Sequence, residues 1–155
     1  MHNIRRLNIG EAALYRRVRL EALRDSPEAF ATSYASALER NDESWIAQAD
    51  DSATGDDRAT FLVLMDDEPV GMAALYRDAE DHSMGELIQM WISPAHRGST
   101  MAAELLEHVF AWAAGCGIQT IRAEVTEGNT RALRFYERQG LRKVDGSGVL
   151  VRVVG

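Results

Sequence analysis

The chain has 155 residues, of which 46% are hydrophobic and 26% are charged, and its net charge is −7. This length and composition are typical of one soluble globular domain spanning residues 1–155, and the chain is too short for two. The acidic balance argues against a nucleic-acid partner. The lack of a long apolar run and of a signal-peptide pattern predicts a cytoplasmic protein with no membrane partner. One cysteine, Cys116, and four scattered histidines offer no ligand spacing, so no metal is expected.

The first segment, residues 2–7, alternates apolar and polar side chains and is predicted to be a strand. A helix over residues 11–23 is predicted next, because apolar residues recur there at helical spacing. The members of this stripe are Leu14, Val18, Ala22 and Leu23. The helix is therefore expected to bury one face.

A second helix is predicted to begin after Ser26, which would cap it, with Pro27 at its first position. It would carry Phe30, Tyr34 and Leu38 at intervals of four residues. Such a stripe is typical of a core face, and the wall of a ligand pocket is the alternative.

A third, short helix and a hairpin are predicted to follow. Asp42 or Ser44 would cap the helix, and the polar residues 52–58 would form a loop after it. Residues 60–65 and 70–76 then have the pattern of two antiparallel strands joined by an acidic turn.

The strand at residues 86–92 is expected in the centre of the sheet, because it is apolar on both of its faces. Pro94 ends this strand, and a helix over about residues 100–114 follows. The residues of the helix that are expected to face inward are Met101, Leu105, Leu106, Val109, Phe110 and Ala113.

Residues 118–125 are predicted to form a strand, and its place after a strand and a helix implies a right-handed parallel crossover. A helix over about residues 129–139 is capped by Asn129 or Thr130, and a hairpin over 141–153 closes the chain. This order of elements predicts an α/β fold with a mixed sheet.

The turn between the strand at 86–92 and its helix has the features of an anion site. Arg97, Gly98, Ser99 and Thr100 lie where the helix has not yet begun its internal hydrogen bonds, so several amide N–H groups are free. The helix dipole and the charge of Arg97 would both attract a pyrophosphate there. The alternative is an ordinary turn, in which Gly98 supplies the backbone conformation and Ser99 or Thr100 caps the helix.

Two motifs carry a resemblance to a known family. The segment ISPAHRGSTMAAELL is similar to the acyl-CoA signature of the GCN5-related N-acetyltransferase (GNAT) superfamily, and EVTEGNTRALRFYERQGL is similar to a later motif of that family. The resemblance covers nearly the whole chain and is strongest over residues 86–141. It implies the family's mixed sheet, flanked by helices, in which the strands at 86–92 and 118–125 are parallel and splay apart. It also implies acetyl-CoA as the co-substrate.

The resemblance assigns a set of cofactor-binding residues. In the signature, Arg97 matches the first position and Ala102 the last, while Thr100 stands where the family usually has glycine. A Cβ at Thr100 would crowd the pyrophosphate, although its amide can still donate. The residues implied for acetyl-CoA are Met90, Trp91 and Ile92 by their main chain, Arg97, Gly98, Ser99, Thr100, Met101 and Ala102 around the pyrophosphate, and Asn129 on the cofactor arm.

The resemblance also assigns catalytic residues. Tyr136 matches the tyrosine that protonates the departing thiolate of CoA, and a buried structural tyrosine is the alternative. Glu124 matches the general base of one branch of the family, and Glu86 matches the base of another. Glu124 is preferred and Glu86 comes next.

The function implied is transfer of acetyl from acetyl-CoA to a primary amine of a small molecule or peptide, by direct attack in a ternary complex. A non-catalytic domain that binds acyl-CoA is the alternative, suggested by Thr100. The acidic balance favours a cationic amine or a peptide terminus as acceptor. Phe30, Tyr34 and Trp45 are candidate walls of the acceptor pocket. This pocket is either open or completed by a second subunit, so a homodimer is one alternative.

Overall fold

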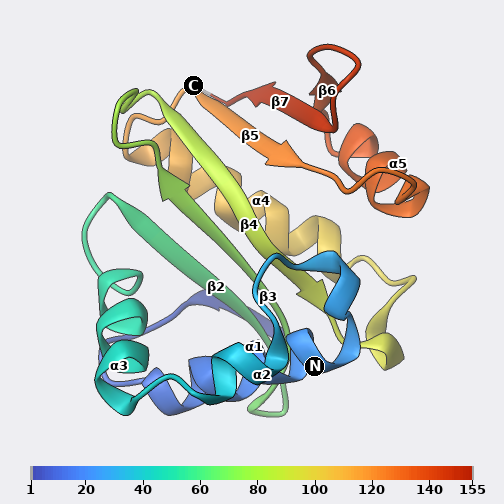
Figure 1. Cartoon of the computed structure of the whole chain (residues 1–155). Helices are drawn as coiled ribbons and strands as arrows, with labels where there is room; N and C mark the ends of the chain where they lie inside the picture. The colour runs from blue at the N-terminus through green and yellow to red at the C-terminus, as the bar shows by residue number, and fades with distance from the viewer. Residues whose placement is uncertain (1, 155) are drawn as a thin grey trace.

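The computed structural model describes residues 2–154 and arranges them around one seven-stranded sheet, with strand order β1-β2-β3-β4-β5-β7-β6 (Figure 1). The strands are β1 His2–Arg6, β2 Arg58–Met65, β3 Glu68–Arg77, β4 Met84–Ile92, β5 Thr120–Glu124, β6 Arg142–Lys143 and β7 Val149–Val153. The helices are α1 Ala12–Asp25, α2 Tyr34–Leu38, α3 Asp42–Asp51, α4 Met101–Gly115 and α5 Thr130–Arg138, with 3-10 turns η1 Pro27–Ala29 and η2 Pro94–His96. The predicted α/β fold with a mixed sheet is confirmed.

Helices cover the sheet on both faces, and each face has its own hydrophobic core. Helix α4 lies behind the sheet in Figure 1, while α1, α2 and α3 lie in front of it. The core on the α4 side includes Leu105, Val109 and Ile121, and the core on the α1 side includes Tyr15 and Trp45. Strand β4 contributes to both cores, which confirms its predicted place in the centre of the sheet.

The inward face of α4 is the one that its sequence predicts. The buried residues of this helix are Met101, Leu105, Leu106, Val109, Phe110 and Ala113. Their spacing places them on one face of the helix, and this face packs against the sheet, where it is shielded from water. This packing fixes where α4 begins, at the end of the turn that follows β4.

Strands β4 and β5 are parallel only over their first halves. Their register runs from Met84↔Thr120 to Leu87↔Ala123 and ends there. Two residues further on, Gln89 has φ 56°, a left-handed conformation that is uncommon for a residue other than glycine. The pairing of β4 with β3 shifts its register at the same place, between Met72 and Ala74. The bulge therefore turns β4 away from β5, and the two strands diverge toward their carboxyl ends (Figure 1).

The prediction of one continuous helix after Ser26 is wrong. Pro27 begins only a short 3-10 turn, and Phe30 is extended, with φ −130° and ψ 146°. Helix α2 begins afresh at Tyr34, because the side chain of Ser33 accepts a hydrogen bond from the Ser36 amide at 3.1 Å. Two serines able to cap a helix stand seven positions apart, and the second one begins the α-helix.

The cap of α3 differs from expectation, whereas the cap of α5 agrees with it. Asn41 caps α3 in place of Asp42 or Ser44, and its side chain accepts from the Ser44 amide at 2.8 Å. Asn129 caps α5, which is one of the two predicted residues, and it accepts from the Ala132 amide at 3.2 Å.

Among residues 2–154, no helix combines the length and the apolar character that crossing a membrane requires.

The divergence of β5 is held by a close contact with the chain before β7, and this contact gives a stability prediction. The Val125 amide donates to the Gly148 carbonyl at 2.7 Å, and a Cβ on Gly148 would overlap the carbonyl oxygen of Val125. Because that oxygen belongs to the backbone, we expect Gly148→Ala to lower the free energy of unfolding by about 1–3 kcal/mol.

Urea denaturation measures the effect, and Gly146→Ala is the matched control, since nothing lies within 4 Å of a Cβ at that position. Equal stability of the two variants would contradict the role of the contact.

Candidate active site

A cleft of about 900 Å³ opens where β4 and β5 diverge. One wall is formed by the end of β4, the turn after it and the first residues of α4, and the other by the loop after β5 and helix α5. The segment around η1 lies at one end. The lining comprises residues 26, 28–30, 90–92, 96–100, 102–103, 126–129, 131–132, 135–136 and 138–139.

The structure brings most of the predicted site residues together in this cleft. Those that line it are Met90, Trp91, Ile92, Arg97, Gly98, Ser99, Thr100, Ala102, Asn129 and Tyr136. Met101 is only 6% exposed and packs in the core. Glu86 and Glu124 lie on the paired strands outside the lining.

The turn before α4 presents free backbone donors to the cleft. The amides of Gly98, Ser99 and Thr100 have no hydrogen-bond acceptor among the described residues. Gly98 has φ 81°, a conformation that glycine adopts without strain. Three consecutive free N–H groups at the start of a 15-residue helix are able to donate hydrogen bonds to an anion.

Thr100 fits this turn without backbone strain. It is the N-cap of α4, with φ −82° and ψ −2°, which is an ordinary right-handed conformation for any residue. Its side chain makes no capping hydrogen bond, whereas the Ser99 hydroxyl accepts from the Met101 amide at 3.3 Å. Thr100 therefore does not need to be glycine for the turn to form, and its side chain is free at the cleft.

The Arg97 side chain joins three segments around the turn. Its Nε donates to the Ile92 carbonyl at 2.8 Å, and its Nη2 lies 2.7 Å from the Asp25 carboxylate. The same carboxylate oxygen accepts from the Trp91 indole at 2.9 Å. The hydrogen bonds from Trp91 and Ser26, together with Arg97, hold the pKa of Asp25 below its usual value. Asp25 thus ties the end of α1 to the end of β4 and to the turn.

Tyr136 stands in the cleft as a protonated phenol. It is 9% exposed, and burial raises the pKa of its hydroxyl to about 12. No residue described in the structure hydrogen-bonds this hydroxyl. At neutral pH the group therefore keeps its proton and can donate it to a nearby base.

The two predicted bases share one arginine. Arg122 Nη1 lies 2.8 Å from the Glu86 carboxylate, and its Nη2 lies 3.8 Å from that of Glu124. Arg122 is the β5 partner of Glu86 in the parallel register, so adjacent strands place the three side chains in one row. Glu124 is the more exposed of the two carboxylates, at 64% against 40%.

Several residues of the site carry no clear signal in the sequence. Asp25, Gln89 and Arg122 gain their importance from partners far along the chain, and neither spacing nor composition singles them out. Arg131 and Arg138 of α5 also line the cleft. Their separation of seven residues places them on one face of a helix, which is a signal that could have found them.

Comparisons with known proteins agree on one family. The model of the Acetyltransferase (GNAT) family matches residues 6–141. Uncharacterized N-acetyltransferases of Mycobacterium bovis and Mycobacterium tuberculosis are 34% identical over 90 residues, which is 58% of this chain. The match spans only 56% of the length of each of these relatives.

Solved structures share the fold. An acetyltransferase of the GNAT family from Streptococcus pneumoniae superposes with a TM-score of 0.83 at 16% identity, covering all of both chains. A paia N-acetyltransferase from Thermoplasma acidophilum, solved in complex with coenzyme A, has a TM-score of 0.80 at 19% identity and covers 99% of each chain.

The raised pKa of Tyr136 predicts how its variant responds to alkali. The folded protein holds the phenol neutral, while the unfolded chain ionises it near pH 10, so the fold loses stability as the pH rises above 10. The variant Tyr136→Phe lacks this penalty. We expect wild type to lose about 1.4 kcal/mol relative to Tyr136→Phe between pH 8 and pH 11.

Urea denaturation of both proteins at the two pH values measures this difference. An unchanged stability difference would mean that the Tyr136 hydroxyl is hydrated in the folded state.

Proposed function

The chain belongs to the acetyltransferase (GNAT) family, and on this premise we propose that it transfers acetyl from acetyl-CoA to a primary amine of a small molecule or peptide. The amine attacks directly, in a complex that holds both substrates. The observation that carries the proposal is the cleft between β4 and β5, which has free amides at one end and a protonated Tyr136 in its wall.

The described residues fit acetyl-CoA. The amides of Gly98, Ser99 and Thr100 would hold its pyrophosphate, because they are free and lie at the positive end of the α4 dipole. Since β4 pairs with β5 only as far as Leu87, residues 90–92 have no strand partner on that side, and their main chain, apart from the Ile92 carbonyl that Arg97 occupies, would be available for the pantetheine arm. A main-chain N–H there would also stabilise the thioester oxygen as it gains negative charge.

Arg97 has a supporting role in this proposal. Its Nε and Nη2 already bond Ile92 and Asp25, so its main contribution is to fix the turn and add positive charge to it. Asn129 likewise uses its side-chain oxygen to cap α5, and its amide nitrogen remains available to the cofactor arm.

Tyr136 would act as the general acid. As the amine nitrogen bonds to the acetyl carbon, the bond from that carbon to sulfur breaks, and the phenol gives its proton to the departing thiolate. Because its pKa is raised, Tyr136 is neutral at neutral pH and has a proton to offer as negative charge develops on the sulfur beside it.

A glutamate would accept the proton of the amine, and Glu124 is the preferred candidate. Its contact with Arg122 is the longer of the two and its carboxylate is the more exposed, so it is the more accessible to water. Because neither Glu124 nor Glu86 lines the cleft, a water molecule would carry the proton to the carboxylate. Glu86 remains the second candidate.

The catalytic proposal is tested with Tyr136→Phe. We expect the variant to bind acetyl-CoA with unchanged affinity by calorimetry, and to release CoA thiol at least about 10²-fold more slowly with an amine substrate. An unchanged kcat would remove Tyr136 from the mechanism. Binding of acetyl-CoA by wild type without turnover across a broad amine panel would favour the alternative, a non-catalytic acyl-CoA domain.

Thr100 supplies a prediction about affinity. Its backbone conformation suits any residue, so only the Cβ and hydroxyl can crowd a pyrophosphate. We expect Thr100→Gly to tighten acetyl-CoA binding roughly fivefold, about 1 kcal/mol, as measured by calorimetry. Thr100→Ala keeps the Cβ and is the matched control. Weaker binding by Thr100→Gly would show instead that the threonine hydroxyl holds the phosphate.

A further inference from the structure

Arg19 is a buried cation without a counterion. It lies on the sheet-facing side of α1 and is only 7% exposed. Its Nη1 has no hydrogen-bond partner, and no carboxylate among residues 2–154 lies within ion-pair distance of it. Buried charges in proteins are normally paired, because an unpaired one loses its hydration and gains nothing in return.

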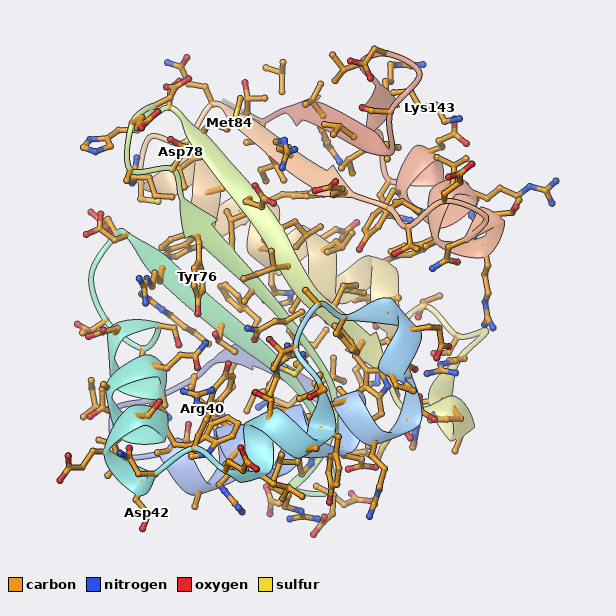
Figure 2. The ribbon with its side chains drawn as sticks, in the orientation of Figure 1. Arg40, Asp42, Tyr76, Asp78, Met84 and Lys143 are labelled. Carbon is orange, nitrogen blue, oxygen red and sulfur yellow. The ribbon has the colours of Figure 1, made fainter. Side chains whose placement is uncertain are left out.

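Among the residues that the structure describes, no carboxylate is found to act on the charge of Arg19. The groups that act on its charge are Tyr15, Tyr76 and Arg40, of which the last is a second cation. Arg40 and Tyr76 lie on the face of the sheet that α1, α2 and α3 cover (Figure 2). Burial lowers the pKa of Arg19, yet an arginine keeps its proton in a protein. The positive charge is therefore present and unneutralised.

One contact of Arg19 reaches a residue that lines the cleft, and Tyr15, one turn earlier on the helix, bonds the strand that forms one wall. The Arg19 guanidinium carbon lies 4.7 Å from the centre of the Phe30 ring, and Phe30 lines the cleft. Tyr15 lies one turn before Arg19 on the same face of α1, and its hydroxyl donates a hydrogen bond to the Gln89 side chain at 3.0 Å. Gln89 directly precedes Met90, which lines the cleft. Phe30 thus contacts the guanidinium and also lines the cleft. It lies in the extended segment between η1 and α2, outside either helix.

We propose that Arg19 binds a carboxylate of the acceptor, so that the preferred acceptors are amines that also carry a carboxylate, as amino acids do. This inference rests on the proposed acetyltransferase function. A planar guanidinium pairs with a carboxylate through two parallel hydrogen bonds, and Nη1 is unsatisfied without one. The local charge around Arg19 thus opposes the cationic acceptor that the overall charge of the chain suggests.

Matched acceptors test the inference. Wild type, Arg19→Met and Arg24→Met are assayed with the common amino acids and with the corresponding amino-acid amides, which lack the carboxylate. Arg24 is the control because it is exposed, lies on the same helix and makes none of the ion pairs of the described residues. In wild type we expect a higher kcat/KM for the acid than for the amide. This preference should fall about 10- to 100-fold in Arg19→Met and stay unchanged in Arg24→Met.

A second measurement does not depend on turnover. N-acetylated amino acids carry the carboxylate but no free amine, and they should raise the Tm of wild type and of Arg24→Met but not that of Arg19→Met. N-acetylated amino-acid amides should raise none of them. Without ligand, Arg19→Met should unfold at the same or a higher temperature than wild type, because it removes an unpaired buried charge.

The outcomes separate the two proposals. Equal turnover of acids and amides by wild type, unaffected by Arg19→Met, would overturn the inference and leave the acetyltransferase function standing. A marked fall in the Tm of ligand-free Arg19→Met would also overturn it, since Arg19 would then be a structural residue. If no amine is acetylated, the proposed function fails, and the thermal shift with N-acetylated amino acids alone decides whether Arg19 binds a carboxylate.

Discussion

The early end of the pairing between β4 and β5 is the constraint on which the rest of the structure depends. Both strands are packed against α4 over their paired halves, through Leu87, Ile121 and Ala123. Beyond that point the left-handed Gln89 turns β4 aside, and the hydrogen bond from Tyr15 holds the Gln89 side chain. The cleft is the space that this divergence leaves. The opening therefore follows from the course of the β4 backbone.

The Asp25 carboxylate organises the near end of the cleft. It accepts hydrogen bonds from the indole of Trp91 and the guanidinium of Arg97, on either side of the end of β4. Charge-assisted hydrogen bonds of this kind are stronger than neutral ones, and here they replace part of the contact that Arg97 would otherwise make with an anion. In the proposed site the free backbone amides of the turn are then the principal donors, and the arginine would keep them in position.

Sequence patterns predict the parts of this protein that are set by local periodicity. The six inward residues of α4 and the central place of β4 follow from spacing, and the cap of α5 is one of the two residues that the sequence offers. The break at Phe30 does not, because two competing capping serines make a continuous helix and a broken one look alike. The roles of Asp25, Gln89 and Arg122 were also unpredictable, since each depends on a partner more than thirty residues away. Motif resemblance supplied the candidate site residues, and ten of the thirteen line the cleft.

Helix α1 carries two residues of the proposed site, Asp25 and Arg19, and nothing in its sequence marks either of them. Its last residue, Asp25, bonds the turn before α4, and Arg19 lies six residues earlier, which is about 9 Å along a helix axis. If a ligand at either end displaces this helix as a unit, binding at the proposed Arg19 site and binding at the turn would each change the other's free energy by the same amount. A single helix thus carries one residue of each end of the proposed site.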